Sequence, residues 1–272
     1  MSWKIIEFLQ ELKECFDIRR LMDYKKLMFK SICLLRHDID HDINEALKIG
    51  KIEYSLGIQS TYFVLHDATY YGDNNFIKNC LELQDMGHEI GFHNNLLTTT
   101  IKTGYDIKDL LEKELNYLKN NNINIFGTAA HGDPLCRRLY YTNYEIFKDC
   151  SPPYKEKREA LSIEKDVGKV IKKIKKAGNT GVTLDSIKGI KLHTLDLKDY
   201  GLYEAYFLPR DFYVTDCQDK WIHVEKDIDE WHPDFRPNLP KCEDIVPFLK
   251  EVSKDKIVLQ ALIHPNLKLI EI

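Results

Sequence analysis

The first half of the chain alternates short apolar runs with longer segments of helical periodicity, and no other feature constrains the fold as strongly. The apolar runs cover residues 31–38, 60–65, 88–93 and 123–131. The helical segments between them cover residues 43–57, 74–87 and 107–121. Strands that are separated by one helix each predict right-handed βαβ units and a parallel sheet. Because the runs are apolar at consecutive positions, we expect both faces of this sheet to be covered.

The second half is less regular. It offers helices at about 163–177 and 243–253 and strands at about 202–208, 211–216 and 256–265. About seven or eight strands with interleaved helices predict an α/β fold, a distorted or incomplete (β/α) barrel of about seven strands, with a doubly wound open sheet as the alternative. No repeat or Ser/Gly linker interrupts the sequence, so we expect one domain over residues 1–272. It would carry an amphipathic N-terminal helix (about 3–14) and an irregular insertion (about 178–240).

Composition excludes several classes of function. The net charge of −4 argues against a nucleic-acid-binding protein, which would show a basic stripe. No apolar stretch approaches the roughly 18 residues of a membrane span, and the N-terminus lacks the apolar core of a signal peptide. The 7 cysteines are scattered without a C-x-x-C pair, which favours reduced thiols and a cytoplasmic location. The sequence does not indicate the oligomeric state.

Four of the apolar runs end in His or Asp, in the segments LLRHDID, HEIGFH, GTAAH and ALIHP. In α/β barrels the C-terminal ends of the strands meet at one rim, where active sites form. Polar residues at these ends are therefore expected to be neighbours in space. The alternative is that each side chain only anchors its own loop.

Asp38 and Asp40 are two residues apart at the end of the first run. In an extended strand they point to the same side, where two carboxylates repel each other unless a cation lies between them. A divalent metal bound by one carboxylate would leave the other as a general base near a metal-bound water. The alternative is capping of the helix that begins near Ile43, the role we expect for Asp42.

The remaining candidates are histidines. His93 closes its run, whereas His88 and Glu89 open it and are expected at the opposite, structural end of the barrel. His131 follows two alanines that leave room for a ligand, and His264 precedes a proline. A His₂-carboxylate set with open positions is a common hydrolytic metal site. Asp40 and His93, with either His131 or His264, could supply it.

The order of the segments RHDID, GHEIGFH, AAHG, YVTDCQDKW and LIHP resembles the polysaccharide deacetylase (NodB-homology, carbohydrate esterase family 4) superfamily. It is most similar to the branch with an R-H-D-[VI]-D first motif, and the resemblance covers about residues 31–266. It implies a distorted, incomplete (β/α) barrel, usually of seven strands. It also implies that Asp216 and Trp221, which match the fourth motif, shape and tune the substrate pocket.

The resemblance assigns roles to four further residues. Asp38 would be the catalytic base, Asp40 and His93 metal ligands, and His264 the general acid.

Two positions depart from the family pattern. The second His of the H-x-x-x-H motif falls on Leu97, which cannot bind a metal, and the third motif lacks the Arg that pairs with the catalytic base. We hypothesise that His131 takes the missing ligand position. Arg36, two residues before Asp38 and on the same strand face, would take the role of the Arg.

The resemblance predicts a metal-dependent hydrolase that removes an N-acyl group, with acetyl as the expected group, from an amino sugar. The expected cofactor is one divalent ion, zinc before iron, cobalt, manganese or nickel. A cytoplasmic sugar precursor of lipopolysaccharide or capsule fits better than a polymer. The alternative is a catalytically inactive sugar-binding relative, which Leu97 favours. A metal-dependent phosphoesterase would call for an H-x-H on the first strand, whereas His37 and His41 are four apart.

Overall fold

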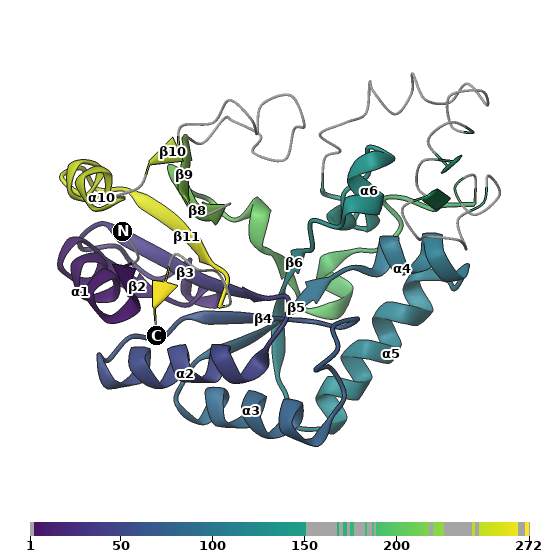
Figure 1. The fold of residues 1–272 in the computed structure, drawn as a ribbon, viewed down its shortest axis with the longest axis horizontal. Coiled ribbons are helices and arrows are strands. Elements are labelled where there is room, and N and C mark those ends of the chain that lie inside the picture. The colour runs from purple at the N-terminus through teal and green to yellow at the C-terminus, as the bar shows by residue number, and fades with distance from the viewer. Residues whose placement is uncertain are drawn as a thin grey trace.

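A curled, mainly parallel sheet with helices around its outside forms the centre of the computed structural model (Figure 1). The structure describes residues 3–150, 168, 171–172, 175–176, 183, 187, 189–217, 220–225, 241–242, 245–265 and 270–271. Most of the helix expected at 163–177 and part of the insertion expected at 178–240 lie outside these residues.

The strands follow a single order across the sheet: β10 (Lys241–Cys242), β9 (Lys220–Glu225), β8 (Phe212–Cys217), β11 (Val258–Ile263), β3 (Ile32–Ile39), β4 (Thr61–Leu65), β5 (Glu89–Asn94), β6 (Ile125–Ala130) and β7 (Tyr203–Glu204). A further strand, β2 (Asp17–Arg19), pairs with the start of β3. The seven strands from β8 to β7 are parallel, and no pairing among the described residues joins β7 to β8. The fold is therefore α/β, with a curled seven-stranded half-barrel surrounded by helices, compatible with the predicted distorted barrel.

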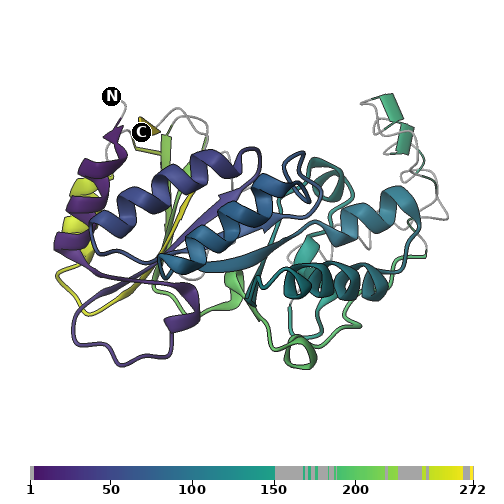
Figure 2. The same cartoon turned by 90° about the horizontal axis from the view of Figure 1, so that it is seen from below.

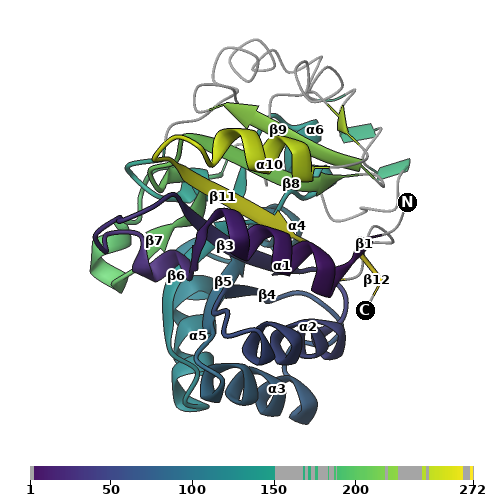
Figure 3. The same ribbon diagram turned by 90° about the vertical axis from the view of Figure 1, so that its left-hand side faces the viewer.

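Helices lie around this sheet (Figure 1). They are α1 (Ile5–Cys15), α2 (Ile43–Ser55), α3 (Asn74–Asp85), α4 (Leu96–Thr103), α5 (Ile107–Asn120), α6 (Pro134–Arg138) and α10 (Val246–Val252). Helices α2 and α3 lie side by side across the sheet (Figure 2). Helices α1 and α10 pack together over β3 and β11, and β1 (Trp3–Lys4) pairs with β12 (Ile270–Glu271) near the two ends of the chain (Figure 3).

Strand β3 shows why its apolar residues are consecutive. Cys33 and Leu35 pack in the cluster that contains the buried residues of α1, whereas Ile32 and Leu34 belong to a separate cluster on the other face. Both faces are covered, as predicted. Continuing this alternation, Arg36 and Asp38 face the inside of the half-barrel together.

The ends of the helices follow the local sequence. The carboxylate of Asp42 accepts a hydrogen bond from the Asn44 backbone N–H at 2.8 Å, which confirms its predicted capping role. Gly57 and Gly87, with φ values of 68° and 89°, follow the C-terminal ends of α2 and α3. Glycine adopts this left-handed conformation without steric cost, so both predicted helix ends are confirmed.

The structure differs from the predicted elements in several places. The strand expected at 202–208 is limited to β7, because the chain turns into a 3₁₀ helix, η4 (Ala205–Phe207), which the Glu204 carboxylate caps. The structure also contains an antiparallel strand, β9, beside β8. Within the described part of the chain, no helix is long and apolar enough to cross a membrane.

Candidate metal centre

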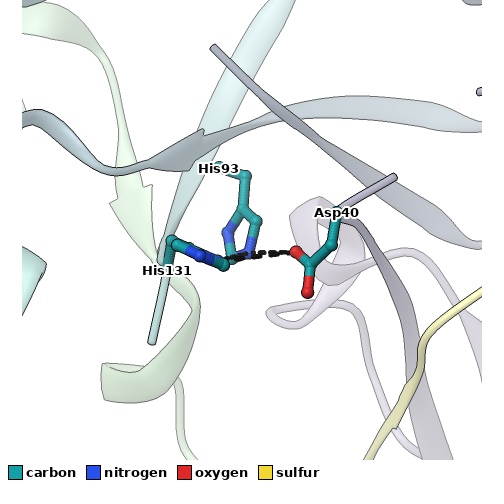
Figure 4. Close-up of side chains that lie close together, drawn as sticks. All are labelled: Asp40, His93 and His131. Carbon is teal, nitrogen blue, oxygen red and sulfur yellow. Dashed lines mark hydrogen bonds and ion pairs between the residues drawn. The ribbon is translucent and has the colours of Figure 1, made fainter. Parts of the chain in front are cut away.

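Three of the predicted ligands meet at the C-terminal edge of the sheet. Asp40 directly follows β3, His93 lies near the end of β5, and His131 directly follows β6. Their side chains point toward one another (Figure 4). One ligand atom from each lies within 4.8 Å of the others, so the group could hold a metal ion. Of the two histidines proposed for the third position, His131 is the one that joins this group.

The distances within this triad have the dimensions of a metal site. Asp40 Oδ1 lies 3.3 Å from His93 Nε2 and 3.4 Å from His131 Nδ1. The two histidine nitrogens are 3.2 Å apart. Tetrahedral bonds of about 2.0–2.2 Å to one ion would place any two ligand atoms about 3.3–3.6 Å apart. The three side chains therefore need little movement to bind one ion.

The hydrogen bonds around the triad leave lone pairs directed inward. His93 Nδ1 lies 2.9 Å from the Ala129 carbonyl oxygen, to which it donates a proton, so the lone pair of a neutral ring is on Nε2. No described residue donates a hydrogen bond of good geometry to the buried Asp40 Oδ1. Acceptor atoms this close repel each other unless a proton or a metal cation lies between them.

The pKa shifts of His93 and Asp40 in the metal-free chain reflect how close the three side chains of the triad lie. Burial lowers the pKa of His93, but the nearby carboxylates of Asp38 and Asp40 outweigh it and raise the pKa overall. Burial raises the pKa of Asp40, but His131 and His93 outweigh it and hold the pKa well below its usual range. Positive charge is thus favoured at this position.

The backbone of His131 is fixed on both sides. Its N–H donates to the Asn94 carbonyl oxygen at 2.8 Å, and its carbonyl oxygen accepts from Asn143 Nδ2 at 2.8 Å. Asn143 Nδ2 also donates to Asn95 Oδ1 at 3.0 Å. Sequence reasoning missed Asn143, which lies in the 3₁₀ helix η2 (Asn143–Ile146), because no local pattern distinguishes it. Asn94 and Asn95 directly follow His93 and could have been noticed there.

Asp38 lies between a guanidinium group and the triad. Arg36 Nη2 is 3.5 Å from Asp38 Oδ2, and both side chains are buried. The same Asp38 oxygen is 3.8 Å from His93 Nε2. The guanidinium carbon of Arg36 also lies 4.3 Å from the centre of the Tyr206 ring. Arg36 is therefore the cation beside Asp38, as the shared strand face predicts.

His264 is held by Asp216. His264 Nδ1 is 2.6 Å from Asp216 Oδ1, and the His264 backbone N–H donates to Asp216 Oδ2 at 2.9 Å. Burial lowers the pKa of His264, but Asp216, with smaller contributions from Asp38 and Asp40, raises it to about 9. Both oxygens of Asp216 thus bind His264, and its expected role in shaping and tuning the substrate pocket stays a prediction.

Two other residues lie away from the triad. The Trp221 ring is fully buried and stacks on Phe8 of α1, with 4.9 Å between ring centroids. The indole packs among the residues beneath α1 and α10, and its expected part in shaping and tuning the substrate pocket stays a prediction. Leu97 is buried in the hydrophobic core on α4. The family's second histidine position thus belongs to the core of this chain.

Fold and site together define an α/β half-barrel protein with a candidate metal centre of one carboxylate and two imidazoles. Comparisons of the chain with protein-family models, with curated proteins and with solved structures found no match.

Proposed function

We propose that the chain is a metal-dependent hydrolase that removes an acetyl group from the nitrogen of an amino sugar or glycan precursor. The observation that carries this proposal is the triad of Asp40, His93 and His131, with Asp38 beside it and His264 raised in basicity at the same rim. A metal-binding group next to both a carboxylate base and a protonated imidazole is the set that amide hydrolysis requires.

The triad fits a divalent ion, and zinc is the ion that we propose. One carboxylate and two imidazoles leave at least one coordination position open, as in catalytic zinc sites. The same ligands could bind iron, cobalt, manganese or nickel. When bound, such an ion supplies Lewis acidity, which polarises a carbonyl oxygen and lowers the pKa of a water molecule.

The residues of the chain move the protons. Asp38 accepts a proton from the attacking water, and the guanidinium of Arg36 at 3.5 Å orients the carboxylate. His264 donates a proton to the departing amine nitrogen. Because Nδ1 of His264 is bonded to Asp216, the proton that it transfers is the one on Nε2. Asp216 is thus the positioning residue for the acid.

The choice of amino sugar rests on the resemblance of the motifs to polysaccharide deacetylases. A precursor used in making a surface polysaccharide, such as lipopolysaccharide or capsule, is the substrate that we propose, in the cytoplasm. The competing proposal, a sugar-binding protein without activity, rested on Leu97. The inactive sugar-binding protein is less well supported, because His131 supplies the third ligand atom that Leu97 cannot supply.

Metal analysis and acetate release test the proposal together. The purified chain, loaded with zinc, should bind about one ion and release acetate from N-acetylglucosamine, its 1-phosphate or its nucleotide diphosphate derivative. Replacing the base, Asp38→Asn, should lower kcat by about 10²–10⁴-fold and leave one zinc ion bound. Bound sugar without acetate release by the zinc-loaded protein would support the inactive sugar-binding protein.

A further inference from the structure

Two large apolar side chains are exposed in the loop between β2 and β3. After the 3₁₀ helix η1 (Leu21–Asp23) the chain runs through residues 24–31, where Leu27 and Phe29 are 79% and 88% exposed. Every other exposed large hydrophobic side chain among the described residues is at most 65% exposed. In Figure 2 the loop, drawn in purple, extends away from the neighbouring strands and helices. Single exposed apolar residues are common, but two together on a projecting loop indicate a contact surface.

The loop is held in a fixed shape by its neighbours. The guanidinium group of Arg19 on β2 donates to the backbone carbonyl oxygens of Lys26 and Leu27, at 2.9 Å each. Met28, between the two exposed residues, packs against the buried cluster that contains Leu21. A braced backbone therefore presents Leu27 and Phe29 outward, so that a partner that covers them does not have to order the loop first.

Positive charge surrounds the two apolar side chains. Residues 17–30 hold five lysines and arginines against two aspartates, a net charge of +3 in a chain whose net charge is −4. Lys25 and Lys30 are exposed on either side of the apolar pair. The neighbouring turn at residues 251–256, which Ser31 contacts, is neutral and does not cancel this charge. The surface that the loop offers is thus both apolar and basic.

We propose that this loop docks the protein on the surface of an anionic lipid bilayer, with Leu27 and Phe29 entering the boundary between headgroups and acyl chains. The ammonium groups of the lysines reach the lipid phosphates while their apolar stems lie along the bilayer. Charge and apolar character are both complementary to such a surface. Two side chains bury much less than the roughly 1,000 Å² of a specific protein interface, which favours the bilayer over a protein partner.

Docking by this loop is independent of the proposed hydrolase. The loop leads into the N-terminal end of β3, whereas Asp40 follows the C-terminal end of the same strand. The 8 residues of β3 span about 26 Å at about 3.3 Å per residue. Loop substitutions should therefore leave zinc affinity unchanged, which separates a failure of this proposal from a failure of the proposed function.

Flotation of the full chain with lipid vesicles tests the proposal. We expect binding to phosphatidylcholine vesicles that contain phosphatidylglycerol, and binding at least about 10-fold weaker to phosphatidylcholine alone. Leu27→Ser combined with Phe29→Ser should weaken binding to the anionic vesicles by at least about 10-fold, because both side chains lose their apolar contact.

The charge of the loop is tested with the same vesicles. Lys25→Gln combined with Lys30→Gln should remove most of the preference for anionic vesicles and its salt dependence. Lys26 is left unchanged, because it pairs with Asp23 at 2.7 Å. Tyr105→Ser is the matched control, at a 65% exposed side chain between α4 and α5, and should bind as the native chain does. Circular dichroism checks that each variant is folded.

Fluorescence distinguishes insertion from attraction by charge alone. With anionic vesicles, Phe29→Trp should show a blue shift relative to the native chain and quenching by brominated acyl chains, whereas Tyr105→Trp should show neither. Failure of the native chain to bind anionic vesicles overturns the proposal, as does equal binding by the native chain and the double serine variant. A dimer that forms without lipid and dissociates in the double serine variant, measured by sedimentation, would assign the loop to a second copy of the chain and also overturn it.

Discussion

At the scale of single residues, each histidine of the site is defined by the nitrogen that its neighbours leave available. Hydrogen bonding to the Ala129 carbonyl leaves Nε2 of His93 for the triad, whereas His131 presents Nδ1 to Asp40. His264 commits Nδ1 to Asp216. The His93 ring thus offers an acceptor nitrogen to the triad, which matches its proposed role as a metal ligand. The His264 ring is arranged as a donor, which matches its proposed role as the acid.

Removing His131 should abolish tight metal binding. We expect His131→Ala to weaken zinc affinity by more than about 100-fold, beyond the effect of losing a residue that only supports a ligand. Zinc at about 100 times its Kd should stabilise the native chain by about 2.7 kcal/mol, and the variant should lose this gain. Chelator competition and thermal melts measure both effects. His41→Ala is the control, since His41 is exposed and outside the triad; equal zinc affinity in both variants would contradict the assignment.

The pairing of His264 with Asp216 makes a prediction about pH. In the metal-free chain the imidazole should titrate near the pKa of about 9, and Asp216→Asn should bring this pKa down, because burial then acts without the carboxylate. NMR titration of the His264 ring measures the shift. The proposed acid must be protonated, so the alkaline limb of acetate release should move to lower pH in the variant. Asp211→Asn, whose carboxylate binds the Val258 N–H at the opposite end of the same strands, should change neither.

The same pair links pH to stability. The folded-state pKa of His264 is raised above the ordinary histidine value of about 6.5, so its protonated form stabilises the fold. This contribution is complete below about pH 6.5 and is lost as the pH rises through about 9. Urea denaturation of the metal-free chain at pH 6 and pH 10 should therefore show a smaller pH-dependent loss of stability in Asp216→Asn than in the native chain.

At the scale of elements, a buried polar network attaches α2 to the sheet behind the site. Glu53 on α2 accepts hydrogen bonds from Ser60 and from Tyr62 at 2.6 Å each, and lies 2.8 Å from His37 Nε2. His37 precedes Asp38 on β3 and faces the opposite side. Burial raises the pKa of Glu53, but His37, His88 and Ser60 together outweigh burial and lower the pKa. The network therefore fixes the outer face of the strand that carries the proposed base.

Neutralising Glu53 should destabilise the whole chain. Glu53→Gln leaves buried partners of the carboxylate unsatisfied, and we expect it to lower the free energy of unfolding by about 3–5 kcal/mol. Urea denaturation measures the change. Glu82 on the neighbouring helix α3 also forms an ion pair, with Lys51 at 2.7 Å, but it is solvent-accessible. Glu82→Gln should therefore cost no more than about 1 kcal/mol, and equal costs for the two variants would contradict the role of the network.

Local patterns predicted the elements that depend on nearby residues. Strands β3, β4, β5 and β6 and helices α2, α3 and α5 lie within the predicted runs or differ at their ends by a few residues. Strand β9 was missed because it depends on antiparallel pairing with β8, and α4 because its run of threonines favours strands over helices. Strand β7 is short because the Glu204 side chain caps a turn, which periodicity does not show.

The site residues also fall into those that local patterns predicted and those that they did not. Asp40, His93 and His131 could be predicted because each ends an apolar run, and parallel strands bring such ends to one edge. The contact of Asn143 with His131 and the pairing of Asp216 with His264 could not, because no local pattern relates the two residues of either pair. Trp221 matched a motif of the polysaccharide deacetylases that the sequence resembles, but in the structure it packs against Phe8 of α1 in the core.

At the scale of the whole molecule, the first helix joins the two halves of the chain. Phe8 of α1 stacks on Trp221 of β9 with an interplanar angle of 17°, and both rings are fully buried. The cluster around them also contains Leu249 of α10 and Leu259 of β11. This packing on the outer face adds to the direct pairing of β3 with β11, which joins the N-terminal and C-terminal parts of the sheet.

Because the Phe8 cluster and the triad lie in different parts of the fold, we expect a mutation in the cluster to change stability without changing metal binding. Phe8→Ala removes a buried ring on the outer face, and we expect it to lower the free energy of unfolding by about 3–5 kcal/mol through loss of packing and the cavity left behind. Zinc affinity should stay the same in the folded variant, because the triad lies at the edge of the sheet and shares no contact with Phe8. Urea denaturation and chelator competition under native conditions measure the two quantities. Ile6→Ala, at a side chain that is 45% exposed on the same helix, should change neither by much. A parallel fall in zinc affinity and stability in Phe8→Ala would show instead that the outer packing sets the geometry of the metal centre.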